Sequence, residues 1–284
     1  MRVTNVEMQS PTLEEPVDFS LSGNDPTARY QVRNIVGLDA EDLIPKFYGH
    51  GLNADSDYKY YDFSMKPREI VMNIVLKPQF GINETYSNVR DKLYRSISST
   101  RTGKVALDFK SGATTVSRIY GFISKFEVPY FVRLPEVQLT IKCDDPMFRA
   151  INPMVYETSD LPLVNPVIVG DSLSTAPHGF EMEITFDATS PTLTIQDEAT
   201  NPNWKFTVTP KNGFLVGDVL HFSSEYADKY LYLVRAGTTI DLLDKISPSS
   251  IWPLIFPGGN TFYFLEIAKF NWNHIQYYAC YWGV

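Results

Sequence analysis

The clearest alternating pattern in the chain lies in REIVMNIVLK, residues 68–77. Every second residue from Ile70 to Leu76 is apolar, so these side chains share one face of a predicted β-strand. The other face carries Val71 and Val75 and is only partly polar. A strand with one face in solvent alternates more cleanly, so we expect a second cover for this face. Another part of the chain or a neighbouring subunit would supply that cover.

The apolar positions change to a helical spacing in GINETYSNVRDKLYRSISSTRTG, residues 81–103. This spacing predicts one amphipathic helix over residues 84–100, with Asn83 as its N-cap and Gly103 marking its end. Three strand-like runs follow, namely VALDF, SRIYGFISKFEV and EVQLTIKC, separated by turn residues. The first part of the chain therefore predicts a β-domain with one helix.

A change of composition follows in residues 151–179, where INPMVYETSDLPLVNPVIVGDSLSTAPHG is dense in Pro, Gly, Ser and Asp. Such a segment is typical of a linker that leads into a new unit. Short strands at close intervals fill the rest of the chain, which is typical of an antiparallel sandwich. We expect two domains, residues 1–150 and 151–284.

The stretch IKCDDPMFRA, residues 141–150, lies at the predicted boundary. A cysteine beside two carboxylates raises the question of a metal site, but Cys143 also continues the apolar series of the preceding strand. Proline ends a strand ladder and forces the preceding residue into an extended conformation. We therefore expect a buried thiol and an inter-domain hinge formed by Asp145, Pro146 and Phe148.

Composition narrows the classes of function. The 284 residues are 44% hydrophobic and 20% charged, which indicates a globular protein. A net charge of -8 argues against gripping nucleic acid, which needs clustered Lys and Arg. No stretch approaches the roughly 18 apolar residues of a membrane span, and the N-terminus has no signal-peptide pattern. The two cysteines, Cys143 and Cys280, are too few for a disulfide framework and are expected to be buried.

The sequence carries no motif of an enzyme or a metal site. Its four histidines lie far apart, and neither a phosphate-binding loop nor a nucleophile elbow is present. We therefore expect no catalytic residue, no cofactor and no metal. A glycosidase would need two carboxylates roughly 5 to 10 Å apart across a sugar ring. The candidates for such a pair would be Asp187, Asp197, Asp218 and Glu225.

Two groups of residues are candidates for contacts with other molecules. The loop YGHGLNADSDYKYYDFSMKP, residues 48–67, is rich in tyrosine, which supplies large contact areas at low entropic cost. The alternative is an ordered hairpin loop that packs on its own barrel. The candidate contacts with a subunit or partner are Asp55, Asp57, Tyr58, Tyr60, Tyr61, Val71 and Val75.

Tryptophans stack on sugars when exposed, although core packing is the alternative for Trp204, Trp252 and Trp272.

The order of these segments resembles one known family. YYDFSMKPREIVMNIVLKP leads into the NVRDKLYRSISS helix, strands VALDF and IYGFISKFEV follow, and VQLTIKCDDPMF closes the unit. In order and character this resembles the N-terminal domain of the distal tail (Dit) proteins of siphophages. The later segments GFLVGDVLHF, LIFPGGNTFYF and the terminal YWGV are similar to the family's C-terminal galectin-like sandwich. Residues 23–47 depart from the family's pattern.

The resemblance implies a mainly β fold, with an N-terminal split β-barrel that carries one α-helix and a C-terminal galectin-like antiparallel β-sandwich. It implies a structural virion protein at the tip of a long, non-contractile phage tail, assembled in the host cytoplasm. Six copies would form a ring that joins the tail tube to the tail hub or baseplate and lets DNA pass. In some relatives the outer domains carry receptor-binding or side-fibre proteins.

A different class of function stays open at this point. The second domain would act as a non-catalytic carbohydrate-binding module for attachment to the host surface, with Trp204, Trp252 or Trp272 stacking on a sugar ring. The galectin-like resemblance does not by itself confer sugar binding, because a fold does not fix a function. Exposure of these rings beside polar neighbours would favour the carbohydrate-binding function.

Overall fold

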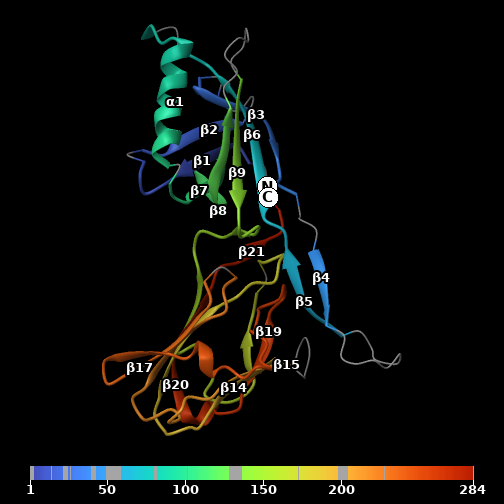
Figure 1. The fold of residues 1–284 in the computed structure, drawn as a ribbon, viewed down its shortest axis with the longest axis vertical. Helices are drawn as coiled ribbons and strands as arrows, with labels where there is room; N and C mark the ends of the chain where they lie inside the picture. Colours follow the sequence, from blue (N-terminus) through green and yellow to red (C-terminus); the bar gives the residue numbers. More distant parts are fainter. Residues whose placement is uncertain are drawn as a thin grey trace. The chain divides into compact units, whose positions relative to one another are not determined.

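The computed structural model divides the chain into two compact units (Figure 1). The first contains residues 1–151 and 282–284, and the second contains residues 152–281. Residues 282–284, at the end of the predicted second domain (residues 151–284), lie in the first unit. The structure describes residues 3–13, 15–21, 25, 27–39, 43–48, 59–79, 82–100, 102–127, 136–171, 173–197, 204–226 and 228–283, with the backbone alone for 43–48, 59–65 and 204.

Seven strands of the first unit form a closed barrel, because β9 pairs with both β6 and β8. The order around the barrel is β8, β7, β1, β2, β3, β6 and β9, and only β2 and β3 run parallel to each other among these pairs. The barrel strands are β1 (Asn5–Gln9), β2 (Val17–Leu21), β3 (Tyr30–Val36), β6 (Arg68–Leu76), β7 (Val105–Ser111), β8 (Thr114–Glu127) and β9 (Glu136–Cys143). Strand β10 (Phe148–Arg149) pairs with β8, while β4 (Leu43–Tyr48) and β5 (Lys59–Met65) form a separate hairpin.

Alternation along the strands fills the barrel with apolar side chains. In β6 the residues from Ile70 to Leu76 at every second position are 0 to 1% exposed, as the sequence pattern predicted. The same holds in β9, where the series that begins at Val137 ends at the buried Cys143. Each inward strand face therefore contributes to one barrel interior, which burial of apolar surface stabilises.

The helix α1 (Tyr86–Thr100) packs one face against the barrel. Its buried residues Val89, Leu93 and Ile97 recur at the spacing of one helical face. At the helix start, the hydroxyl of Thr85 accepts a hydrogen bond from the backbone nitrogen of Asn88 at 3.3 Å. Thr85 is therefore the N-cap, and the prediction of Asn83 was wrong: Asn83 takes the left-handed conformation, with φ 56°.

A buried carboxylate ties the start of the helix to the barrel. Both oxygens of Glu84 lie 2.9 Å from Nε of Arg29, and one lies 3.3 Å from Nζ of Lys92. The backbone nitrogen of Gln79 donates to the same carboxylate at 3.1 Å. Burial alone would raise the pKa of Glu84, but the hydrogen bonds from Gln79, Arg29 and Lys92 outweigh it and lower the pKa.

The second unit contains two antiparallel sheets and one apolar core. The six-stranded sheet has the order β11 (Met154–Glu157), β20 (Phe270–Tyr277), β13 (Glu181–Phe186), β16 (Val219–Ser223), β17 (Tyr230–Arg235) and β18 (Thr238–Asp241). The four-stranded sheet has the order β12 (Val167–Val169), β19 (Asn260–Phe264), β14 (Leu193–Asp197) and β15 (Trp204–Val208). The remaining elements are the short strand β21 (Cys280–Tyr281) and the 3-10 helices η2 (Leu243–Lys245) and η3 (Ile267–Lys269).

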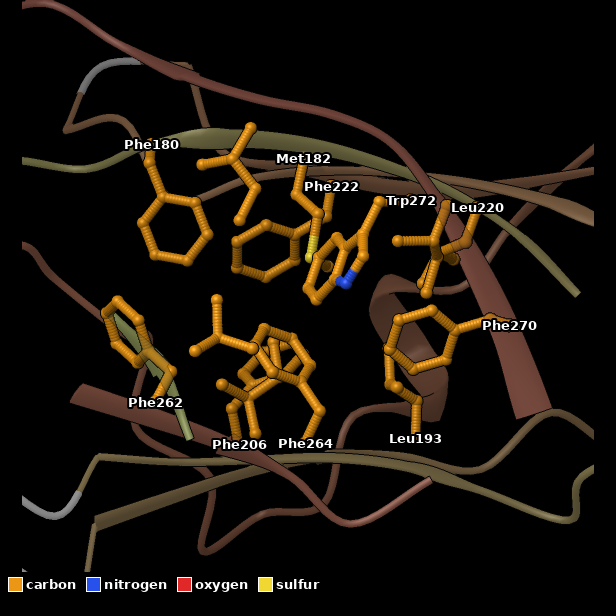
Figure 2. Packing of buried hydrophobic residues seen from close by; sticks show 14 of the residues in the cluster. Phe180, Met182, Leu193, Phe206, Leu220, Phe222, Phe262, Phe264, Phe270 and Trp272 are labelled. Carbon is orange, nitrogen blue, oxygen red and sulfur yellow. The ribbon is translucent and has the colours of Figure 1, made fainter. Parts of the chain in front are cut away.

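Aromatic rings from both sheets fill this core (Figure 2). Trp272 is 1% exposed and meets Phe264 and Phe270 edge to face, at ring distances of 4.8 and 5.1 Å. Phe222 of the six-stranded sheet likewise contacts Phe206 of the four-stranded sheet at 5.2 Å. Edge-to-face contacts suit the charge distribution of aromatic rings and add to the energy of burial.

The expectation of a mainly β protein with one helix is confirmed, since α1 is the one α-helix among the described residues. The barrel is closed by the β8–β9 pairing. No helix in the described part of the chain is long and apolar enough to cross a membrane.

We predict that Glu84→Gln destabilises the first unit at pH 7 and that the difference from the wild type shrinks on acidification. The folded state lowers the pKa of Glu84, so its stabilisation is present above the ordinary glutamate pKa and is lost as the pH falls through the folded value. Urea denaturation at pH 7 and pH 3 measures this. Glu136→Gln is the control, because Glu136 pairs with an Arg33 side chain that is 69% exposed. Equal effects of the two substitutions at both pH values would contradict the prediction.

Candidate functional site

A buried arginine lies at the start of β6. Arg68 is 1% exposed, and its guanidinium donates to four main-chain carbonyls. Nε donates to Pro146 at 2.7 Å, and one terminal nitrogen donates to Gly37 at 2.8 Å and to Asp39 at 2.6 Å. The other terminal nitrogen donates to Trp282 at 2.7 Å. One side chain thus connects the segment after β3, the segment after β9 and the C-terminal residues of the first unit.

An aromatic ring completes the surroundings of this charge. The guanidinium carbon of Arg68 lies 4.7 Å from the ring centroid of Phe148, which is a cation–π contact. Phe148 is 0% exposed and meets Phe109 edge to face at 5.3 Å. Removing a guanidinium from water is costly, and these carbonyl oxygens and the ring face offset that cost.

The carbonyl of Gly37 reaches Arg68 from a left-handed turn. Gly37 has φ 92°, and a Cβ at this position would lie 2.1 Å from the carbonyl oxygen of Glu69. A larger residue would therefore clash with β6 as well as strain the backbone. Glycine is required here for the close approach of the two segments.

The three predicted hinge residues gather around Arg68 and its neighbours. Pro146 supplies a carbonyl and Phe148 supplies the ring, whereas Asp145 organises the turn between them. One oxygen of Asp145 accepts from the backbone nitrogen of Met147 at 3.1 Å, and the other pairs with Arg149 at 2.7 Å. The turn is therefore fixed by local hydrogen bonds and by Arg68.

Sequence reasoning missed Arg68, although a signal existed. Counting back from Ile70 by two residues places position 68 on the buried face of the strand. A charged residue at an inward position needs compensating partners, and this position lies just before the alternating series that predicted β6. The alternating faces were assigned from Ile70 onward, so Arg68 was given no face.

Cys143 is a buried thiol, as expected. It is 0% exposed, and burial raises its pKa to about 12, with nearby Asp145 and Asp144 adding to the shift and Arg68 opposing it. The second cysteine, Cys280, is also buried and free. No group of three or more His, Cys, Asp or Glu side chains suited to a metal ion occurs among the described residues.

Two of the predicted contacts with a subunit or partner, Val71 and Val75, lie on the outer face of the barrel at β6. Val71 lies opposite Val36 of β3 on one side and Thr140 of β9 on the other. Val71 and Val75 are both half-buried, and Val36 is 55% exposed. This outer valine face, defined as Val36, Val71 and Val75, offers apolar surface on the side of β6 that faces away from the barrel interior.

The hairpin β4–β5 lies in the sequence between β3 and β6, the two strands that carry the outer valine face. Tyr60 and Tyr61 lie in β5. Tyr60 pairs with Phe47 of β4, and Tyr61 lies at the bulge between this pair and the next one, Lys46 with Asp62. The other predicted loop contacts, Asp55, Asp57 and Tyr58, lie outside the described residues. Tyr60 and Tyr61 are therefore part of a paired β-hairpin.

The tryptophans do not support a glycan-stacking surface. Trp272 is in the core, and its indole nitrogen donates to the carbonyl of Pro162, which fits the core-packing alternative for this residue. Trp252 is partly buried against Phe206 and Phe222 at ring distances of 5.0 and 5.4 Å. For Trp204 the structure describes the backbone in β15, and its predicted stacking role lies outside the described side chains.

The carboxylates considered for a glycosidase have structural partners. Asp218 is 2% exposed, accepts from Arg235 at 2.6 Å and accepts from the backbone nitrogen of Leu215 at 2.7 Å. Asp197 accepts from the side-chain amide of Asn260 at 2.7 Å. Asp187 accepts from an asparagine amide at the surface, and Glu225 is buried at 5% exposure. Asp218 and Asp197 therefore hold turns and strands together.

We predict that Arg68→Lys lowers the free energy of unfolding of the first unit by about 3 kcal/mol, because a single ammonium cannot reach all four carbonyls and each buried acceptor left unpaired costs about 1–3 kcal/mol. Hydrogen exchange of β6 and β9 measures the change. Arg33→Lys is the matched control, since its side chain is 69% exposed. Equal protection in the two variants would show that the arginine contacts do not stabilise the barrel.

We predict that Asp145→Ala lowers stability by about 1 kcal/mol, through loss of the turn hydrogen bond and of the pair with Arg149. Asp144→Ala, which alters an exposed neighbour, should be close to neutral. Thermal unfolding compares the two variants. Metal analysis of the wild type and Asp145→Ala is the second readout, and loss of a bound metal on substitution would contradict a purely structural role.

Comparisons with known proteins show a likeness in fold. No protein-family model matches the chain, and no curated protein matches it in sequence. Among solved structures, the Dit (gp 19.1) protein of phage SPP1 matches with a TM-score of 0.56 and 13% identity, over 89% of this chain and 93% of that one. That structure is described as a paradigm of the hub adsorption apparatus in phages that infect Gram-positive bacteria.

Two further matches are to the phage P2 baseplate in its activated conformation, with Ca and with Sr. Their TM-scores are 0.45 and 0.41 at 8% identity, and they cover 98% and 96% of this chain and 98% and 97% of theirs. The SPP1 match carries the conclusion: the chain has the fold of a phage distal tail (Dit) protein, as the order of its sequence segments predicted.

Proposed function

We propose that this chain is a structural protein of a phage virion that assembles at the tip of a long, non-contractile tail. The observation that carries the proposal is the likeness to SPP1 Dit across both units, 89% of this chain. A match over the barrel alone would have left the second unit unexplained. The second unit is proposed to be the family's galectin-like sandwich, and its two-sheet architecture with a single core fits that assignment.

The proposed mechanism is assembly rather than turnover. Six copies form a ring that joins the tail tube to the tail hub or baseplate, and the genome passes through the ring. A closed ring uses a heterologous interface, in which two different patches of each subunit meet head to tail. The outer valine face is proposed as one of these patches, because apolar residues exposed on a sheet gain stability when a second copy covers them.

The hairpin β4–β5 supports the same proposal. An isolated two-stranded hairpin is marginally stable in water, and β4 and β5 pair with each other in a sheet of their own. Contacts with a neighbouring copy would stabilise such a hairpin. Tyr60 and Tyr61 of β5, together with Asp55, Asp57 and Tyr58, stay candidates for those contacts.

The net charge of -8 fits a conduit for DNA, because like charge discourages adhesion of the duplex to the wall. The proposed protein partners are the tail tube protein, the tail hub protein and, on the second unit, receptor-binding or side-fibre proteins. Asp145, Pro146 and Phe148 are proposed to set the hinge at which the chain leaves the first unit.

We predict that the purified chain, alone or together with its tail-hub protein, forms a six-membered ring by native mass spectrometry and negative-stain microscopy. Val71→Glu places an unpaired charge in the outer valine face and should reduce the ring population at least tenfold. Ile168→Glu is the matched control, because Ile168 is 66% exposed in the second unit and should leave the ring intact. Monomers under both conditions, with immunogold label absent from phage tail tips, would overturn the proposal.

A further inference from the structure

Two large aromatic side chains are exposed on one strand of the barrel. Tyr120 and Phe122 of β8 are 44% and 37% exposed, and they alternate with the buried residues Ile119 and Gly121. Residues two apart on a strand share a face, so both rings lie on the outside of the barrel. Aromatic residues are enriched where proteins meet, so this pair of rings indicates a contact surface.

The glycine between the two rings allows β8 and β9 to pack closely. A Cβ at Gly121 would lie 2.7 Å from Cγ2 of Ile141 and 2.8 Å from Sγ of Cys143. Any larger residue would therefore push β8 away from β9. The two exposed rings thus belong to a tightly packed part of the barrel wall and not to a loop.

Charged residues border the rings in a row that crosses four segments of the barrel. Nζ of Lys104, just before β7, lies 5.8 Å from the ring centroid of Phe122. Phe122 is the register partner of Lys142 in β9, which in turn is the register partner of Glu69 in β6. Lys104 and Glu69 are both exposed, and neither forms an ion pair within the described part of the chain. The row therefore begins with a positive charge and ends with a negative charge.

We use the name β8 aromatic patch for Tyr120, Phe122 and Lys104. This patch and the outer valine face lie on different sides of the barrel. Only β9 separates β8 from β6, so two of the seven strand intervals, or about 100° around the closed barrel, lie between them. In a six-membered ring each subunit meets its two neighbours in directions about 120° apart. A barrel with its axis along the ring axis therefore presents its two apolar surfaces close to the required angle.

We propose that the β8 aromatic patch is the second surface of the head-to-tail interface, and that it covers the outer valine face of the next copy. This inference rests on the ring proposed above. Tyr120 and Phe122 pack against the valines, which removes apolar surface of both copies from water. Lys104 of one copy then comes beside Glu69 of the next.

The distribution of charge favours this arrangement over a symmetric dimer. Two β8 aromatic patches that met face to face would bring the Lys104 and Lys142 side chains of both copies together, and like charges in an interface are costly. Placing the patch on the outer valine face instead brings the positive end of the row to the negative end. Because the two surfaces differ, each copy keeps one of them free for a further copy, and the chain of contacts can close into a ring.

Disulfide cross-linking between two single-cysteine variants tests the contact. Val71→Cys and Phe122→Cys are purified separately, mixed with the tail-hub protein and oxidised. Disulfide-linked dimers should form in the mixture and not in either variant alone, because the native cysteines are buried. Within one chain the two positions are two strands apart, roughly 10 Å, which exceeds the roughly 7 Å that a disulfide can span. The double variant should therefore give a ladder of linked chains up to the full ring.

Ile168→Cys in place of Phe122→Cys is the matched control. Ile168 is 66% exposed on a strand of the second unit, so this variant should give no linked dimers with Val71→Cys. A wild-type ring in native mass spectrometry, without linked dimers in the mixture, would overturn the inference and leave the proposed function intact. A wild type that forms no ring with its tail-hub protein would overturn both.

Charge reversal tests the ion pair between copies. Lys104→Glu and Glu69→Lys should each reduce the ring population about tenfold at low salt, because like charges then meet in the interface. The two substitutions in one chain exchange the signs and should restore the ring. Lys211→Glu, at an exposed position of the second unit, is the control and should have no effect. A double variant that forms no more ring than either single variant would contradict the contact between Lys104 and Glu69.

Discussion

The first unit depends on the contacts of one guanidinium. Arg68 enters the barrel at an inward position of β6 and binds carbonyls from three segments that are far apart in sequence. Five N–H donors in a rigid plane allow one arginine to do this, and a lysine has neither the geometry nor the reach. Because Trp282 is among its partners, the structure around β6 includes a residue that is 214 positions away in the sequence.

Local patterns predicted the parts of the fold that have a simple period. The alternation in β6 and β9 correctly placed Ile70 and Cys143 inside the barrel, and the helical spacing placed Leu93 on the buried face of α1. The helix cap was assigned incorrectly because the choice between Asn83 and Thr85 depends on the backbone conformation of the preceding turn. A one-dimensional pattern contains the period of an element but not the dihedral angles at its end.

The candidate site was predicted in part, and the missing part has a common cause. Asp145, Pro146 and Phe148 were recognised because a strand end, a proline and an aromatic residue are adjacent in sequence. Arg68 was not singled out, because the carbonyls that accept its hydrogen bonds come from distant segments. Buried polar groups require partners with definite geometry. Their roles are therefore visible only after the chain has brought those partners together.

Each unit contains a buried polar side chain that needs partners inside the protein. The barrel compensates the charge of Arg68 with carbonyl dipoles and the ring of Phe148, whereas in the second unit the buried ring of His178 contacts the carboxylate of Asp171. A carbonyl cage keeps its strength across the pH range because an arginine does not lose its proton. The barrel, which we propose forms the ring, is thus fixed by a centre that keeps its charge across the pH range.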